Sequence, residues 1–123
     1  MPQLLVIDDD PAIRDAYQIA FEANGYTVEV ATDGKAGLEA AKKNNPDVIC
    51  VDMIMPFMGG LEFLKAYEPL KHPHTKVIVS TNSQVPADTE SDVLELGALK
   101  YIRKSAYTPQ QLVDLVKQLV STS

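Results

Sequence analysis

Cysteine, basic charge and long apolar runs are all scarce in this sequence of 123 residues. The single cysteine, Cys50, cannot form an internal disulfide, which agrees with a reducing compartment. Acidic residues outnumber basic residues by 17 to 11, and the net charge of −6 argues against binding to nucleic acid or to an anionic membrane surface. No apolar run approaches the roughly 20 residues of a membrane-spanning helix. The N-terminal Met-Pro-Gln also lacks the basic region of a signal peptide. We therefore expect one cytoplasmic domain, residues 1–123, that binds neither nucleic acid nor membranes directly.

Short apolar runs alternate with amphipathic segments along the whole chain. The expected strands are Leu4–Ile7, Tyr26–Val30, Val48–Val51, Val77–Val79 and Leu99–Ile102. The expected helices run from Pro11 to before Gly25, from Asp33 to Asn44, from Leu61 to Tyr67, from Ala87 to Leu96 and onward from Pro109. Apolar strands joined by helices predict an α/β fold, a doubly wound parallel sheet of five strands with helices on both faces. In such sheets the ligand site lies beyond the carboxyl ends of the strands.

The strand ends carry the polar groups of interest. They are Asp8 and Asp9 after the first strand, Asp52 after the third, Ser80 and Thr81 after the fourth and Lys104 after the fifth. Three carboxylates in a small volume repel one another, and a hard cation relieves that repulsion. Oxygen ligands without a nearby His or Cys suit Mg²⁺. Asp10 comes directly before Pro11, and we expect it to be a helix N-cap and not a member of this group.

Asp52 is the candidate nucleophile of this group. A carboxylate can attack a phosphoryl group and form an aspartyl phosphate. Catalysis of that step rests mainly on positioning and charge neutralisation. Mg²⁺ and Lys104 would supply the positive charge, and the Thr81 hydroxyl would donate a hydrogen bond to a phosphoryl oxygen. Each residue alone has an ordinary structural explanation, since a single Asp after a strand is usually a cap or turn residue.

Four segments carry a family resemblance. They are Leu5–Asp9, Val51–Gly60, Val77–Thr81 and Tyr101–Lys104, and the second contains the pattern D-x-x-M-P-x-M-x-G. With these segments the whole chain resembles a response-regulator receiver domain of two-component signalling, similar to the chemotaxis receiver. The resemblance implies the flavodoxin-like strand order 2-1-3-4-5.

The resemblance also implies a role for each site residue. Asp52 would be the phosphoacceptor and a metal ligand, Asp9 the direct metal ligand, Asp8 the holder of metal-bound water, and the Ile54 carbonyl a third protein ligand of Mg²⁺. Lys104 would contact the phosphoryl group, and Thr81 and Tyr101 would report phosphorylation to the surface. The implied donor is a sensor histidine kinase or phosphotransfer protein, and the implied output is a downstream protein partner or a fused effector domain. Such a domain is a phosphoacceptor that catalyses its own phosphorylation and dephosphorylation, not an enzyme acting on an external substrate.

Two positions depart from the family pattern. Asn82 follows the switch threonine where a small residue is usual, and Ser105 follows Lys104 where proline is usual. The family's lysine–proline bond is commonly cis, but a cis bond before a non-proline residue costs about 2.5–4 kcal/mol. We therefore expect a trans Lys104–Ser105 bond. The spacing from Thr81 to Lys104 leaves Ser80 as the alternative to Thr81 for the hydroxyl role.

Three other functions fit parts of the pattern. A small dehalogenase-type phosphatase would use a D-x-D motif, which Asp8–Asp10 offers, but the chain lacks a substrate-capping insertion. A flavodoxin-like cofactor binder would need a Ser/Thr/Gly-rich phosphate loop after the first strand, where the acidic residues would repel a phosphate. A degenerate receiver that acts only as a docking module would not need all five of Asp8, Asp9, Asp52, Thr81 and Lys104.

Overall fold

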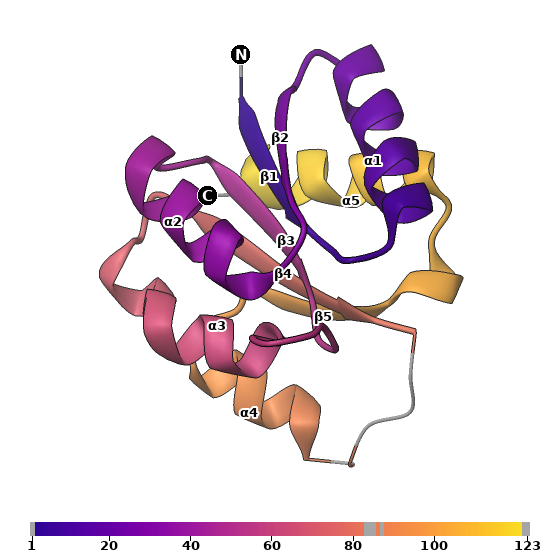
Figure 1. Cartoon of the computed structure of the whole chain (residues 1–123). Helices are drawn as coiled ribbons and strands as arrows, with labels where there is room; N and C mark the ends of the chain where they lie inside the picture. Colours follow the sequence, from indigo (N-terminus) through magenta and orange to yellow (C-terminus); the bar gives the residue numbers. More distant parts are fainter. Residues whose placement is uncertain (1, 83–85, 87, 122–123) are drawn as a thin grey trace.

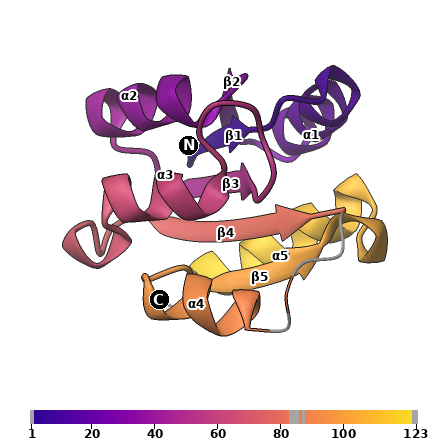
Figure 2. The ribbon, with the colours of Figure 1, turned by 60° about the horizontal axis from the view of Figure 1, so that its bottom comes forward.

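Five parallel strands form a single sheet in the computed structural model, which describes residues 2–82, 86 and 88–121. The strands are β1 (Gln3–Ile7), β2 (Thr27–Ala31), β3 (Val48–Asp52), β4 (Lys76–Thr81) and β5 (Lys100–Arg103). Their order is β2-β1-β3-β4-β5, which confirms the expected topology. Figure 2 shows β4 lying beside β5 with β3 on its other side. The order makes β1 and β3 central neighbours, so the chain reverses its direction of winding between them.

Helices cover both faces of this sheet. They are α1 (Pro11–Ala23), α2 (Gly34–Asn44), α3 (Gly60–Tyr67), α4 (Thr89–Glu95) and α5 (Pro109–Ser121), with short 3₁₀ turns η1 (Pro69–Lys71) and η2 (Lys104–Ala106). Figure 1 shows α1 and α5 on one face and α2, α3 and α4 on the other. No helix in the described part of the chain is long and apolar enough to cross a bilayer.

The alternation of side chains along the strands divides the core into two layers. Leu5 and Ile7 of β1 pack with Phe63 and Leu64 of α3, on the face of α2, α3 and α4. Leu4 and Val6 point the other way and pack in the layer of α1 and α5. Successive residues of a strand face opposite sides of the sheet, so a strand buried on both faces must be apolar throughout. This requirement explains the unbroken apolar runs of β1, β3 and β4.

The helix starts follow the capping signals of the sequence. Asp10 accepts a hydrogen bond from the Ala12 N–H at 2.9 Å, and Pro11 is the first residue of α1. Thr108 and Gln111 form the expected reciprocal capping box at the start of α5, with distances of 2.8 and 3.1 Å. The start expected at Ala87 lies outside the described residues, and α4 is helical from Thr89.

Several strand boundaries differ from the sequence expectation by one or two residues. Tyr26 precedes β2 because its N–H bonds to the Phe21 carbonyl at 3.0 Å in the turn that ends α1. Its ring also packs edge-on against Phe21, with centroids 5.1 Å apart. Strand β5 begins at Lys100, one residue later than expected, and β4 extends to include Thr81. The Lys104–Ser105 peptide bond is trans, as expected.

Candidate functional site

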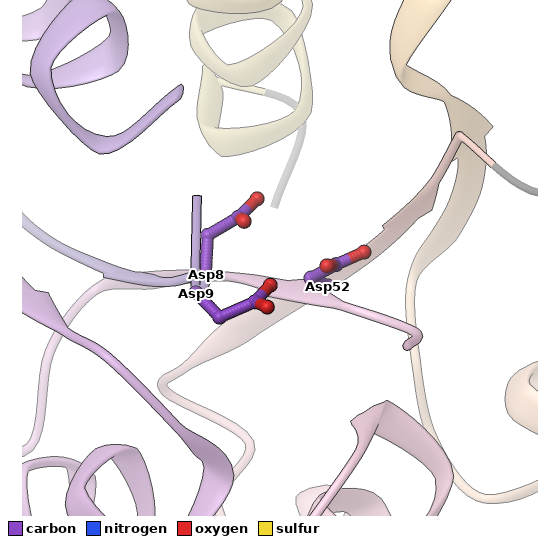
Figure 3. A group of neighbouring side chains, drawn as sticks. All are labelled: Asp8, Asp9 and Asp52. Carbon is purple, nitrogen blue, oxygen red and sulfur yellow. The ribbon is translucent and has the colours of Figure 1, made fainter. Parts of the chain in front are cut away.

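Three carboxylates meet at the carboxyl ends of β1 and β3. Ile7 pairs with Val51 across the two strands, so Asp8 and Asp52 come next to each other at the sheet edge. One carboxylate oxygen from each of Asp8, Asp9 and Asp52 lies within 4.8 Å of the other two. Figure 3 shows the three side chains gathered at this edge. Asp8 and Asp52 are buried, with 2% and 7% of their surfaces exposed, whereas Asp9 is exposed.

Lys104 joins this cluster from the far side of β4. It lies in η2, directly after β5, and its side chain crosses the end of β4 to reach the acidic group. Its Nζ lies 2.5 Å from Asp8 Oδ2 and 3.3 Å from Asp52 Oδ1. Lys104 is itself 7% exposed. The buried carboxylates therefore share one buried cation, which offsets part of their mutual repulsion.

Two further contacts hold Asp8 in place. The Arg14 guanidinium donates a hydrogen bond to the Asp8 carbonyl at 2.8 Å, and the Asp10 N–H donates to Asp8 Oδ1 at 3.0 Å. The sequence analysis did not identify Arg14. Its signal is weak, because a half-buried arginine in the second turn of a helix is common and only the fold shows which carbonyl it reaches.

The protonation of Asp52 is set by opposing influences. Together they raise the pKa of its carboxyl from 3.8 to about 6: burial raises it most, Lys104 lowers it, and the neighbouring Asp8 raises it. A backbone hydrogen bond with Ile54 also lowers the pKa. At neutral pH the carboxyl is mostly ionised, so it retains a nucleophilic oxygen while being largely removed from water.

Thr81 and Ser80 face opposite sides of the sheet at the end of β4. Thr81 shares the face of Val77 and Val79, in the layer against which Tyr101 packs. Ser80 has the same orientation as Ile78, which lies in the other layer. Because Val79 pairs with Tyr101 across β4 and β5, Thr81 is a diagonal neighbour of Tyr101 on one face. This arrangement favours Thr81 over Ser80 as the hydroxyl coupled to Tyr101.

Tyr101 is half-buried, and its hydroxyl oxygen is buried without a hydrogen-bond partner among the described residues. Burial raises the pKa of this phenol. A buried hydroxyl without a partner carries a free-energy cost. The ring therefore occupies a position that its hydroxyl does not stabilise.

The cluster opens into a pocket of about 430 Å³. Its lining includes Asp8, Asp9, Asp10, Pro11, Asp52, Ile54, Asn82 and Lys104. Ile54 is 56% exposed at the pocket rim. Asn82, the departure after Thr81, brings a neutral amide to this lining. The β3–α3 loop folds tightly back onto the strand end, because the Gly60 N–H bonds to the Met53 carbonyl at 2.9 Å and a Cβ on Gly60 would meet the Asp52 carbonyl oxygen at 2.9 Å.

The donor set fits a hard divalent cation. It offers carboxylate oxygens from three residues at one edge, two of them buried, and the pocket leaves space for water beside them. Mg²⁺ usually binds to one or two carboxylates and retains several waters. The expected ligands Asp8, Asp9 and Asp52 are thus brought together, and Ile54 lies at the same pocket.

Comparison with known proteins gives a consistent result. The family model described as the response regulator receiver domain matches residues 4–117. This chain belongs to that family. Receiver domains of two-component response regulators act in phosphorelay signal transduction.

Individual relatives agree with this assignment. The chain is 42% identical over 121 residues to the response regulator MprA of a Mycobacterium species (strain KMS), covering 98% of this chain and 52% of that protein. It is 38% identical over 105 residues to a putative transcriptional regulator of Pseudomonas aeruginosa, covering 85% of this chain and 50% of the relative. The chain thus spans about half the length of these curated relatives.

Solved structures show the same fold. A CheY-like response regulator receiver domain from Methanospirillum hungatei superposes with a TM-score of 0.90 at 29% identity, covering 99% of this chain and 95% of that one. The chemotaxis protein CheY4 of Vibrio cholerae gives a TM-score of 0.85 at 30% identity, covering 96% and 98% of the two chains.

Proposed function

We propose that Asp52 accepts a phosphoryl group and that residues 1–123 constitute one phosphoacceptor domain. The observation that carries this proposal is the Asp52 carboxylate, which ends a central strand between two further carboxylates and a buried lysine. In the reaction an Asp52 carboxylate oxygen bonds to phosphorus while the bond from phosphorus to the donor's imidazole nitrogen breaks. The imidazole nitrogen keeps the electron pair of that bond and can take up a proton. The domain catalyses this transfer and the later hydrolysis on itself.

Asp8, Asp9, Asp52 and the Ile54 carbonyl would hold Mg²⁺ in this proposal. The ion would neutralise charge on the carboxylates and on the phosphoryl oxygens. Lys104 would exchange part of its contact with Asp8 for a contact with a phosphoryl oxygen. The distances of 2.5 and 3.3 Å to the two acids leave its ammonium group already beside the reacting carboxylate.

Thr81 and Tyr101 would transmit the modification to the surface. The Thr81 hydroxyl would move toward the phosphoryl group, and Tyr101 would turn inward into the space that Thr81 leaves. Partners would read the changed surface of α4, β5 and α5. The ring is half-buried and its hydroxyl has no hydrogen-bond partner among the described residues, which supports two accessible positions for the ring. Phosphorylation would change the populations of these two positions.

The proposed phosphodonor is a sensor histidine kinase or a phosphotransfer protein, and the proposed location is the cytoplasm. The output is either a separate protein partner or an effector domain fused to this one, with no direct nucleic acid binding by the receiver itself. The greater length of the curated relatives supports a fused effector domain.

Labelling with acetyl phosphate tests the chemical part of the proposal. With Mg²⁺ the chain should gain one phosphoryl group that is stable in acid and labile in base, and EDTA should prevent the gain. Asp52→Asn should gain none. Asp47→Asn, which changes a carboxylate at the opposite end of β3, is the matched control and should be labelled like the wild type. Labelling of Asp52→Asn, or labelling unaffected by EDTA, would refute the proposal.

The same assay separates the alternative functions. A dehalogenase-type phosphatase would release phosphate over many turnovers from added phosphomonoesters, and a docking-only receiver would not be labelled at all. A structure with beryllium fluoride on Asp52 tests the switch. If Thr81 moves while the Tyr101 ring keeps its position, the two residues are not coupled.

A further inference from the structure

Phe57 is the most exposed of the large apolar side chains in the described residues. It lies in the loop from β3 to α3, five residues after Asp52, and 98% of its surface is exposed. An aromatic ring in this position buries almost no area, so it contributes almost nothing to the core. The Phe57 side chain is therefore not needed for the stability of the fold.

The backbone at Phe57 adds a second cost. Its φ of 69° is positive, and residues other than glycine, above all bulky ones, rarely adopt a positive φ. The Met58 N–H donates to the Pro56 carbonyl at 2.8 Å, which closes a three-residue turn with Phe57 at its centre. Such a turn with positive φ at its centre is strained, and glycine would fit it with less strain. A large apolar side chain held in strained backbone points to function at this position.

Phe57 adjoins the phosphoacceptor pocket through Ile54. Ile54 lines the acidic pocket, and together with Phe57 it also lines a second hollow of about 230 Å³ on the α3 side. Both side chains are exposed, so the apolar surface continues from the rim of the acidic pocket outward along the loop. A molecule that delivers a phosphoryl group to Asp52 must enter this pocket, and Ile54 forms part of its rim.

The charges around the surface indicate the chemistry of its partner. Asp9 and Asp10 are exposed at the acidic pocket, and exposed Glu62 lines the second hollow. A small donor such as acetyl phosphate offers only one methyl group as apolar surface, too little to cover the Phe57 ring. A protein donor can place apolar side chains on Phe57 and Ile54 and cationic side chains against the surrounding carboxylates.

We propose that Phe57 and Ile54 form an apolar docking surface for the protein that carries the phosphorylated histidine. This inference rests on the proposed function of Asp52, and it assigns the partner of that same site. The Phe57 ring contacts the donor protein beside its phosphohistidine and holds that residue over the pocket. Phe57 thus affects how the protein donor binds and leaves the chemistry at Asp52 unchanged.

Phosphotransfer from a protein donor tests this surface. The probes are catalytic fragments of histidine kinases phosphorylated with ATP, and the fragment that transfers fastest to the wild type is used for all variants. Phe57→Asn should raise the KM for this donor about tenfold with little change in maximal rate, because the aromatic contact is lost. Phe57→Tyr, which keeps the ring, should restore transfer. Labelling by acetyl phosphate should be the same for both variants and the wild type.

The controls distinguish this inference from the proposed function. Leu70→Asn removes another exposed apolar side chain, in η1 beyond the far end of α3, and should leave both donors unaffected. Phe57→Asn should remain folded in thermal unfolding, because the exposed Phe57 side chain contributes almost nothing to the core. Failure of the wild type to react with acetyl phosphate would refute the proposed function itself. If acetyl phosphate labels Asp52 but Phe57→Asn keeps the wild-type KM, or no kinase fragment transfers to the wild type, the docking surface is refuted alone.

Discussion

The polar groups at the two ends of the sheet have different surroundings. At the amino end, the Asp47 carboxylate accepts a hydrogen bond from the Gln3 N–H at 2.7 Å and lies 2.9 Å from His74 Nε2, partly in contact with water. The buried Thr75 hydroxyl there donates to the Pro46 carbonyl at 2.6 Å. At the carboxyl end, Asp8 and Asp52 are buried beside each other and depend on Lys104 for compensation.

This difference separates structural from functional polar groups. The amino end uses side-chain hydrogen bonds to join loops, which is what satisfied polar groups ordinarily do. The carboxyl end keeps carboxylates close together and out of water, and the pKa of Asp52 rises to about 6 as a result. Such an arrangement lowers stability, and the proposed phosphoacceptor role of Asp52 would account for it.

Replacing Lys104 should have the largest effect on stability. Lys104→Met removes the cation from two buried carboxylates, and the loss of one partner of a buried ion pair costs about 3–5 kcal/mol. Lys71→Met is the matched control, because Lys71 pairs with Glu68 at 2.9 Å in an exposed position beyond the far end of α3. That pair should contribute about 0.5 kcal/mol or less. Urea unfolding at neutral pH in EDTA measures both, and equal losses would contradict the proposed contrast.

The pH dependence of stability should show the raised pKa of Asp52. Between about pH 4 and pH 6 the folded carboxyl holds a proton that the unfolded chain has lost. The unfolded state then binds fewer protons, so stability falls as the pH rises through this range. The folded and unfolded pKa values of Asp52 differ by about two, which corresponds to a loss of about 3 kcal/mol in the free energy of unfolding.

Asp52→Asn removes this titration, which gives a direct comparison. In EDTA the variant should gain stability relative to the wild type as the pH rises from about 4 to 7, by up to the same roughly 3 kcal/mol. Thermal unfolding in a pH series measures the difference between the two proteins. A difference that is constant over this range would show that Asp52 titrates alike in the folded and unfolded chains.

Asp9 should have a smaller effect, because its side chain is exposed. Asp9→Asn should raise stability in EDTA by about 0.5–1 kcal/mol through relief of repulsion, and it should weaken Mg²⁺ binding. Mg²⁺ at 100 times its dissociation constant should stabilise the wild type by roughly 3 kcal/mol. Asp10→Asn is the control, since it removes a neighbouring charge but preserves the cap of α1. A lower melting temperature for Asp9→Asn in EDTA would show that the cluster is not strained at Asp9.

A kinetic effect of similar size concerns the lifetime of the phosphorylated state. The apolar side chain of Ile54 cannot orient an attacking water, so we expect slow hydrolysis. Ile54→Asn adds an amide that can orient water, and it should speed phosphate loss about fivefold, or about 1 kcal/mol in activation free energy. Ile54→Val should leave the rate unchanged. Ser83, expected to be poorly suited to the same task, lies outside the described residues. A rate for Ile54→Asn equal to or below the wild-type rate would refute this role.

Local patterns in the sequence were sufficient for the elements and for most of the site. The capping residues Asp10 and Thr108 and the apolar runs predicted where helices and strands lie, because these signals act over a few residues. Boundaries were less accurate at turns, as at Tyr26, whose N–H bonds to the Phe21 carbonyl in the turn that ends α1. Arg14 was missed because its contact with the Asp8 carbonyl depends on how α1 leaves the sheet.

The sequence by itself determined that five short strands would form a parallel sheet with Asp8, Asp9 and Asp52 at one edge, since strand ends of a parallel sheet converge. Only the tertiary structure decided how those groups interact. Lys104 is 96 residues from Asp8 in the chain, and the strand order is what brings its ammonium to both buried acids. The face that Thr81 shares with Tyr101 follows from the register of β4 and β5. The strained, exposed position of Phe57 likewise arises from the return of the chain from β3 to α3, because long-range packing fixes a backbone geometry that local sequence preferences would not choose.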